Sequence, residues 1–579
     1  MTHYEVGTGL AEITAFKKDI GMMGYGMHWN TVTDIETPLL ARAFLFRSPD
    51  RDQAVGIVIC DMCFVSQAVK SGVMKKLRRK HPEIALTEAS LMLLAQHTHS
   101  GPGGYNHYGL YNISVPGFVP EVYQQIVAGI TEAIRQAWNH FQPAKLRFSK
   151  GEFAPNPEIA SNRSMKAYLR NPEAQGANPK RPEMAVDRTM RLLRMDRPDG
   201  TPIGAINWLG VHTTSVHNDN HSICWDNKGY AADYLERELR EKSGNADFLG
   251  AFAQGAAGDV TPNYQYDKKK KWTRGRYADD FASARHNGRL QYEVAREIHQ
   301  NAAAEPPVAG NLDSGLLHVN FSDVLCDPVF TNGVENARTA AACHGVAFFA
   351  GTQEGPGMVP VIVHAARFMA WWVKQYEKFT VLFQARHQRR RLRHKYAAHG
   401  KKVILIEAGE RRVLGTAWVK GLVVPGFADP TIRYFKRLHP RGWDEDKPWV
   451  PHVLPLQIVT LGSLAIVGLP AEATTIAGQR LRQVVEKELA AHGIHEVIIA
   501  PYANAYCGYL TTREEYDVQA YEGGHTVFGQ WTLAAFQTKL RSLAREMAKL
   551  RDARQLTDEV RPPEFSEEEL RRRTYHPSL

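Results

Sequence analysis

The sequence predicts an α/β protein in which mixed sheets are flanked by helices. Short β-branched runs alternate with amphipathic helical segments along most of the 579 residues, which is the order of elements found in such folds. Several of these runs end abruptly in polar residues and a glycine-rich loop, as residues 91–104 do. The content of 44% apolar and 23% charged residues is that of a globular protein, and a chain of this length can bury a large core.

The first predicted unit is a pair of parallel strands joined by a helix. Residues 54–59 form a β-branched run, residues 66–80 have helical character, and residues 91–95 form a second apolar run. The order strand, helix, strand favours a parallel pair with a crossover helix. Apolar side chains recur at helical spacing over residues 120–141, which predicts an amphipathic helix packed on the sheet.

Further strands and helices are predicted beyond a long polar loop at residues 155–187. This loop is rich in proline, asparagine and charge, and long loops inside compact domains are often functional. The strands predicted after it cover residues 203–209, 248–253, 402–407, 455–461, 464–469 and 497–500, and the helices cover 229–242, 474–492 and 531–550, with another ending near 304.

The strand at residues 91–95 leads into the most informative stretch, His97-Thr98-His99, which precedes a Ser-Gly-Pro-Gly-Gly loop. In extended geometry His97 and His99 point to the same side of the chain. Two neutral imidazole nitrogens on a rigid strand end suit a transition metal such as zinc. A single buried histidine is more often a satisfied core residue, so a metal site requires further ligands from elsewhere in the chain.

Other predicted strands also end in polar side chains that could complete such a site. Two histidines and one carboxylate with an open position form a known zinc-hydrolase arrangement. The polar residues at these strand ends are His212, Asp259 with Thr261, Glu472, and a tyrosine cluster at 502–509.

The formal charge of +10 favours polyanions or anionic membrane surfaces as partners. Part of the excess lies in the basic run at residues 386–395, which follows an aromatic patch at residues 368–373. We interpret the basic run as a solvated helix face or insertion loop, with a contact to anionic lipid or phosphate as the alternative. The aromatic patch is expected in a buried or interfacial helix.

The six cysteines are sparse and most lie in apolar surroundings, which indicates free buried thiols. Cys60 and Cys63 form a C-x-x-C without a second pair, so a redox or zinc role there is the lesser alternative. The N-terminus has no basic and apolar leader, and no apolar stretch reaches the roughly 20 residues that span a bilayer. We therefore expect a cytoplasmic protein.

The sequence resembles the neutral/alkaline non-lysosomal ceramidase family in several blocks that occur in the family's order. The resemblance covers nearly all of residues 5–550. The blocks are residues 97–104, 207–212 with 226–229, 258–263, 472–475 with 478–482, and 504–509 with 514–516 and 521–522.

The resemblance implies a zinc-dependent amidohydrolase that cleaves the N-acyl amide bond of ceramide-like lipids, giving a sphingoid base and a fatty acid. It implies that zinc is held by His97, His212, Glu472 and Tyr509, and that His99 lines the site without ligating the metal. Zinc in such a site polarises the amide carbonyl or lowers the pKa of bound water to about 7.

The resemblance also assigns residues to the substrate. Arg163 and Tyr521 match residues that contact substrate or the developing oxyanion, where each donor contributes about 3 kcal/mol in comparable sites. Gly101, Gly103 and Asp259 are expected to line the pocket for the acyl amide.

Thr261 is a departure from the family, which carries a serine assigned as nucleophile at this position. The hydroxyl is retained, but the additional methyl group stiffens the side chain and crowds the approach. A covalent acyl-enzyme and a direct attack by zinc-bound hydroxide are both left open.

We expect one ceramidase-like catalytic domain over residues 1–555 and a charged C-terminal tail over residues 556–579. The C-terminal β-sandwich and secretion signal of the family are not visible. The expected partners are a lipid-like N-acyl amide substrate and, peripherally, an anionic membrane surface, with no nucleic acid. The alternatives are a zinc hydrolase of another N-acyl amine, lactone or ester, and a non-enzymatic basic binding module, whose binding would depend steeply on salt.

Overall fold

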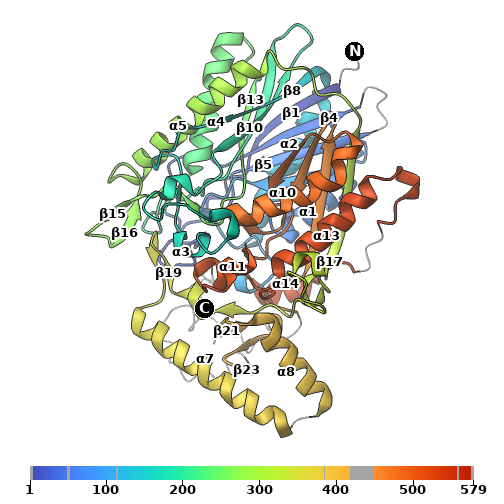
Figure 1. The fold of residues 1–579 in the computed structure, drawn as a ribbon. Helices are drawn as coiled ribbons and strands as arrows, with labels where there is room; N and C mark the ends of the chain where they lie inside the picture. The colour runs from blue at the N-terminus through green and yellow to red at the C-terminus, as the bar shows by residue number, and fades with distance from the viewer. Residues whose placement is uncertain are drawn as a thin grey trace.

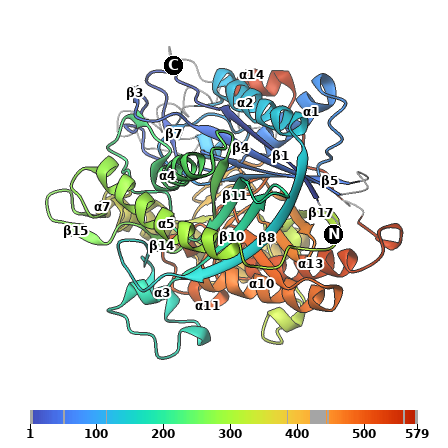
Figure 2. The same cartoon turned by 90° about the horizontal axis from the view of Figure 1, so that it is seen from above.

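The computed structural model describes residues 4–48, 53–112, 115, 117–383, 385–417, 442, 447–556 and 560–574. Two sheets pack face to face, and helices cover the outer face of each (Figure 1). Seen from above, α1 and α2 lie on one side of the strands and α10 and α13 on the other (Figure 2). The predicted mixed α/β class is confirmed.

The larger sheet has eight strands in the order β13-β11-β10-β8-β1-β4-β5-β6. Its pairs are antiparallel except β5–β6 and β11–β13. The strands are β1 (Tyr4–Glu12), β4 (Leu40–Arg47), β5 (Ala54–Cys60), β6 (Leu91–Ala95), β8 (Gln142–Glu152), β10 (Thr189–Asp196), β11 (Pro202–Leu209) and β13 (Leu249–Gln254).

Four helices cover the outer face of this sheet. They are α1 (Gln67–Lys80), α2 (Pro120–Asn139), α4 (Asp226–Ser243) and α5 (Asp280–Ala302). The α1 helix connects the parallel strands β5 and β6, as predicted, and Ser66 caps its first turn by accepting from the Val69 amide.

The smaller sheet has the order β17-β24-β25-β27. Its strands are β17 (Leu312–Asn320), β24 (Val453–Leu461), β25 (Leu464–Gly468) and β27 (Glu496–Ala500), and α10 (Thr475–Leu489) and α13 (Thr532–Met547) cover its outer face. Side chains of both sheets form one core between them, to which Met92, Leu94, Ile466 and Ile498 contribute. The inner faces of the sheets are therefore apolar, and polar groups gather where the strands end.

A helical hairpin extends from the body of the molecule below the sheets (Figure 1). It consists of α7 (Pro360–Thr380) and α8 (Arg386–His399) and lies beside the small sheet β18-β21-β22-β23, whose strands are β18 (His344–Gly345), β21 (Ile404–Glu407), β22 (Arg412–Val413) and β23 (Thr416–Ala417). None of the described helices combines the length and the hydrophobicity needed to cross a membrane.

Part of the charged C-terminal tail packs on the body of the molecule. Residues 567–573 form α14 (Glu567–Arg573), which starts with a capping box at Ser566. The Phe118 amide donates to the Arg573 carbonyl, and the Arg573 side chain is buried. This part of the tail packs on the body because its arginine and glutamate side chains find partners there, whereas the division at residue 555 stays a prediction.

Candidate active site

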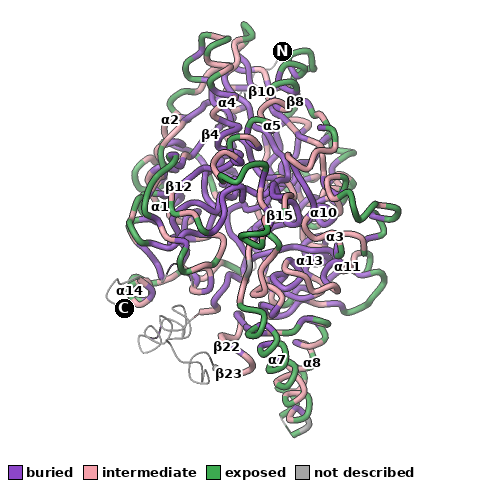
Figure 3. The backbone as a smooth tube through the Cα atoms, turned by 90° about the vertical axis from the view of Figure 1, so that its left-hand side faces the viewer, coloured by how far each residue is buried: buried purple, intermediate pink, exposed green. Residues whose placement is uncertain are grey.

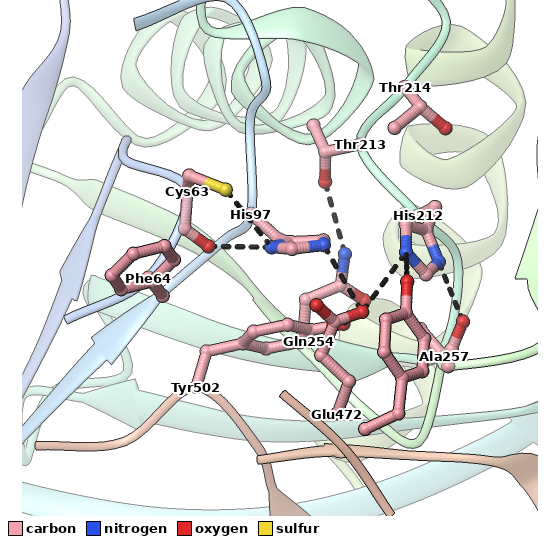
Figure 4. Close-up of polar contacts among 12 residues, drawn as sticks. Cys63, Phe64, His97, His212, Thr213, Thr214, Gln254, Ala257, Glu472 and Tyr502 are labelled. Atoms are coloured by element: carbon pink, nitrogen blue, oxygen red, sulfur yellow. Dashed lines mark hydrogen bonds and ion pairs between the residues drawn. The ribbon is translucent and has the colours of Figure 1, made fainter. Parts of the chain in front are cut away.

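Three of the polar strand ends meet in one buried cluster of His97, His212 and Glu472 (Figure 4). Their ligand-capable atoms all lie within 4.8 Å of one another. The Glu472 Oε2 atom is 3.5 Å from His97 Nε2 and 3.2 Å from His212 Nε2. The side chains are 1–3% exposed, so almost no bulk water reaches these atoms.

The cluster is assembled from the ends of both sheets. His97 follows β6 and His212 follows β11, whereas Glu472 begins β26 (Glu472–Ala473) after β25. The predicted extended geometry at the first histidine is wrong: β6 ends at Ala95 and His97 has a φ of 82°. His97 and His99 nevertheless lie side by side, with ring centroids 4.6 Å apart at 88°, because the turn brings them together.

Backbone carbonyls fix the tautomer of both cluster histidines. His97 Nδ1 lies 2.6 Å from the Cys63 carbonyl, and His212 Nδ1 lies 2.7 Å from the Ala257 carbonyl and 3.0 Å from that of Val260. A carbonyl only accepts, so each Nδ1 carries the proton and each Nε2 presents a lone pair toward the glutamate. This arrangement is the usual support of a metal-ligating histidine.

The carboxylate in the cluster is held in its ionised form. Burial alone would raise the pKa of Glu472, but His97 and His212 outweigh it and hold this pKa well below its usual range. Burial and the nearby Arg163 charge lower the pKa of His212, which favours the neutral imidazole. Two imidazole Nε2 atoms and one carboxylate oxygen face a common point, and a divalent cation fits this donor set.

Two tyrosines support the same carboxylate and were not assigned individually from the sequence. The Tyr502 hydroxyl donates to Oε2 of Glu472 over 3.2 Å, and the Tyr506 hydroxyl donates to Oε1. Burial and then the Glu472 charge raise the pKa of both phenols well above the usual value, so both remain donors. The tyrosine cluster at 502–509 was the available signal, but the left-handed backbone at Tyr502 and Asn504 is not visible in the sequence.

Tyr509, the predicted fourth ligand, lies at the rim of the cluster. It begins β28 (Tyr509–Leu510), which pairs in parallel with β26, so that Tyr509 lies opposite Glu472. Its hydroxyl is 3.4 Å from His212 Nε2 and accepts from Arg163 Nη2 over 2.9 Å. The structure therefore brings the four predicted ligands together.

Arg163 connects this tyrosine to two buried carboxylates. Its Nε donates to Glu522 over 3.0 Å, its Nη1 to Glu354 over 3.2 Å, and its Nη2 also to the Gly258 carbonyl. Tyr521 lies alongside, with its ring centroid 5.7 Å from the guanidinium carbon. Direct contact of Arg163 and Tyr521 with substrate stays a prediction, and the two glutamates are site residues that the sequence analysis did not assign.

His99 lies on the other side of the cluster, with its Nε2 3.1 Å from His97 Nε2. Its Nδ1 has no hydrogen-bond partner in the described part of the chain. Burial, followed by the neighbouring His97, lowers the pKa of His99 well below its usual range, so the ring is neutral. The Tyr25 ring packs edge-on against it at 4.7 Å, and a Cβ at Gly24 would lie 2.4 Å from its Cγ.

The remaining predicted residues surround the cluster and contact protein groups. Asp259 accepts from the Thr475 amide and hydroxyl and from Asn162, at 2.7–2.8 Å. The Thr261 hydroxyl accepts from the Asn263 amide over 2.9 Å, and no contact joins it to the four ligands among the described residues. These contacts hold the Asp259 carboxylate in place, and its contact with substrate stays a prediction.

Gly101 and Gly103 lie in the loop after His99, where β7 (Gly101–Pro102) pairs with β2 (Met22–Met23). A Cβ at Gly103 would meet Val115 at 2.3 Å, so close packing explains this glycine. Their contact with substrate stays a prediction.

A second set of potential ligands consists of Cys63, His97 and His99. The Cys63 Sγ lies 3.8 Å from His97 Nδ1, which is the protonated nitrogen and cannot bind a metal. Burial raises the pKa of the Cys63 thiol well above its usual value, so the thiolate is disfavoured. All six cysteines are free and buried, as predicted.

Comparison with known proteins identifies one family. The model of the family described as neutral/alkaline non-lysosomal ceramidase, N-terminal, matches residues 4–424 and 438–538. The neutral ceramidase of Pseudomonas aeruginosa is 35% identical over 535 residues, covering 92% of this chain and 70% of that protein. The neutral ceramidase of Mycobacterium tuberculosis is 33% identical over 563 residues, covering 96% and 78%.

Solved structures give the same result. The crystal structure of the Pseudomonas aeruginosa neutral ceramidase superposes with a TM-score of 0.76 at 31% identity, covering 97% of this chain and 77% of that one. A ceramidase structure described as complexed with C2 gives a TM-score of 0.78 at 32% identity, covering 97% and 78%.

Proposed function

The chain belongs to the neutral/alkaline non-lysosomal ceramidase family, and from this premise we propose that it is a zinc-dependent ceramidase. It hydrolyses the N-acyl amide bond of ceramide-like lipids to a sphingoid base and a fatty acid. His97, His212, Glu472 and Tyr509 hold the metal.

One observation supports the metal most directly. The Nε2 lone pairs of His97 and His212 both face the Glu472 carboxylate at 3.2–3.5 Å, while each Nδ1 proton is held by a carbonyl. With both rings neutral, these lone pairs and the negative oxygen would repel one another in a buried site, and a cation among them would remove this repulsion. Nitrogen and carboxylate donors in this number favour zinc over magnesium or calcium.

When bound, zinc would polarise the amide carbonyl and lower the pKa of a bound water. Arg163 donates to the Tyr509 oxygen, which supports this oxygen as a ligand. Tyr521, which lies beside the guanidinium, would donate its hydroxyl proton to the amide oxygen as negative charge develops there. Such a donor contributes about 3 kcal/mol to catalysis in comparable sites. Glu354 and Glu522 keep the guanidinium in place.

His99 holds the substrate on the opposite side. Its ring is neutral because burial lowers its pKa, and its buried Nδ1 lacks a partner among the described residues. That nitrogen accepts a hydrogen bond from a hydroxyl of the lipid headgroup, which removes the cost of an unsatisfied buried group.

The nucleophile is water in this proposal. The Thr261 hydroxyl is bonded to the Asn263 amide and makes no contact with the four ligands, which favours water over a covalent route through threonine. A Thr261→Ala variant should keep most of its activity, and a loss of more than about 100-fold would instead indicate a covalent acyl-enzyme.

Metal analysis together with a substrate panel tests the proposal. We expect about one zinc per chain, loss of zinc in His97→Ala, His212→Ala and Glu472→Ala, and full retention in His492→Ala, whose histidine is exposed. Chelation should abolish ceramide hydrolysis and zinc should restore it. Full zinc retention in all ligand variants would refute the assignment, and turnover of short amides, esters or lactones without any ceramide turnover would indicate another acyl substrate.

A further inference from the structure

The α7–α8 hairpin exposes large apolar side chains to solvent. Figure 3 shows much of α7 as exposed tube at the end of the molecule, with intermediate and buried residues between the exposed ones. The outer face of α7 and of the turn that follows it carries a stripe of six side chains, of which Phe368, Trp372 and Phe379 are 63%, 55% and 64% exposed. We call this set the aromatic stripe; it consists of Val361, Phe368, Trp372, Tyr376, Phe379 and Phe383.

The two faces of α7 are reversed relative to an ordinary surface helix. The stripe residues lie three, four or seven positions apart and so share one face. The face that packs on the protein is made by the smaller side chains Val363, Ala366 and Ala370. A folded chain that turns its small residues inward and its aromatic residues outward marks an interaction surface.

The neighbouring helix α8 supplies a matching positive charge. Residues 360–399 contain nine lysines and arginines and a single acidic residue, Glu377. On α8, Arg391 pairs with Glu410 at 2.7 Å, whereas Arg386, Arg390 and Arg393 are exposed and have no carboxylate partner in the described part of the chain.

The hairpin is continuous with the candidate active site. Its first helix begins six residues after Glu354, which lies between β19 (Gly351–Thr352) and β20 (Gly355–Pro356) and pairs with Arg163 at 3.2 Å. Just before β19, Phe348 packs against Tyr521 and His525 with centroids 5.1 and 4.0 Å apart. The segment that lines the site thus leads directly into the exposed helix.

We propose that the α7–α8 hairpin docks on an anionic membrane surface. The aromatic stripe enters the headgroup region, where tryptophan and tyrosine are favoured, and the α8 arginines pair with lipid phosphates. An apolar face and a basic cluster together give the two signals that stable peripheral binding requires. The docking itself does not depend on the proposed reaction, but its role, which is to bring the site to a substrate that resides in the membrane, rests on the proposed function.

Vesicle cosedimentation tests the docking. The wild type should bind vesicles of phosphatidylcholine with about 30 mol% phosphatidylglycerol much more tightly than pure phosphatidylcholine vesicles, and added salt should weaken the binding. Trp372→Ala with Phe379→Ala, and separately Arg390→Gln with Arg393→Gln, should each reduce the partition coefficient about tenfold or more.

A matched control carries the same kinds of change on another exposed hairpin. Tyr266→Ala with Lys269→Gln alters an exposed aromatic and an exposed lysine in the hairpin of β15 (Gln265–Asp267) and β16 (Trp272–Arg274) and should leave vesicle binding unchanged. All the changed side chains lie on the surface, so we expect every variant to unfold at the wild-type temperature. Thermal unfolding checks that the fold of each variant is intact.

Three results would overturn the docking proposal. The first is that the wild type does not bind anionic vesicles, and the second is that the hairpin variants bind them as tightly as the wild type does. The third is that the wild type binds no vesicles but is a dimer in sedimentation velocity, which Trp372→Ala with Phe379→Ala converts to a monomer. Hydrolysis distinguishes this failure from that of the proposed function. The hairpin variants should hydrolyse a water-soluble short-chain ceramide normally and vesicle ceramide slowly, whereas a wild type that binds vesicles but hydrolyses neither would support docking and refute the reaction.

Discussion

The hydroxyl of Tyr506 offers a test of the metal site that leaves every proposed ligand in place. It donates to Oε1 of Glu472, and the Tyr506 ring stacks on Phe64 with centroids 4.2 Å apart at 10°. Tyr506→Phe keeps the ring and its stacking and removes only the hydroxyl. The carboxylate then loses one of its two tyrosine donors.

The magnitude follows from the burial of this hydrogen bond. Glu472 is 2% exposed, so water cannot replace the lost donor. A hydrogen bond to a charged group contributes about 1.5–3 kcal/mol, which corresponds to about 10–100-fold in zinc affinity. Loss of a partner that supports a metal ligand has effects of about the same size.

Zinc affinity of Tyr506→Phe is measured by competition with a chromogenic chelator. The matched control is Tyr111→Phe, because the Tyr111 ring lies 5.1 Å from Tyr506 and its buried hydroxyl has no hydrogen-bond partner among the described residues. The control should keep the wild-type affinity. Equal affinities for the two variants would refute the reasoning, since Glu472 would then not depend on its tyrosine donor to hold the metal.

Three further predictions concern the surroundings of the site and the fold. Gly24→Ala should reduce kcat/KM about 100-fold, because the added Cβ would lie 2.4 Å from the His99 ring. The control Gly26→Ala should keep its activity, because Gly26 also has a positive φ but no atom lies within 4 Å of an added Cβ. Equal losses of activity in the two variants would contradict a role of His99. Burial lowers the pKa of Lys228 to about 7, so between pH 7 and 10 the unfolded chain binds the additional proton and stability rises with pH. Lys228→Met should remove about 2 kcal/mol of the change between pH 7 and 9, measured by urea unfolding at both pH values. Zinc at about 100 times its Kd should raise the free energy of unfolding by about 2.7 kcal/mol. Calorimetry with and without chelator measures this difference, and equal stabilities under the two conditions would contradict the prediction.

Local patterns in the sequence predict elements better than they predict how the elements pair. The unit of β5, α1 and β6 is confirmed almost to the residue, because apolar periodicity and the crossover order are local features. The antiparallel pairing of β1 with β8 was not predicted, since it connects residues more than a hundred positions apart. No local pattern records such a pairing.

The same distinction applies to the site and to the hairpin. The resemblance to the family supplied His97, His212, Glu472 and Tyr509, which the structure brings together, whereas the strand geometry expected at His97 is wrong. Helical spacing over residues 360–380 indicates a helix but not which of its two apolar faces is packed. Only the tertiary structure shows that the smaller residues face inward.

The position of the cluster between the two sheets connects catalysis to the core. His97 and His212 follow strands of the larger sheet, and Glu472 follows a strand of the smaller one. The sheets are joined at this end by Asn504, whose amide donates to the Leu93 carbonyl and whose side-chain oxygen accepts from the Leu93 amide. A change in the apolar layer between the sheets would alter the distance from Glu472 to the histidines without touching a ligand, because packed interiors transmit strain. For the proposed zinc site, we therefore expect metal affinity to depend on how the two sheets are packed as well as on the donor atoms.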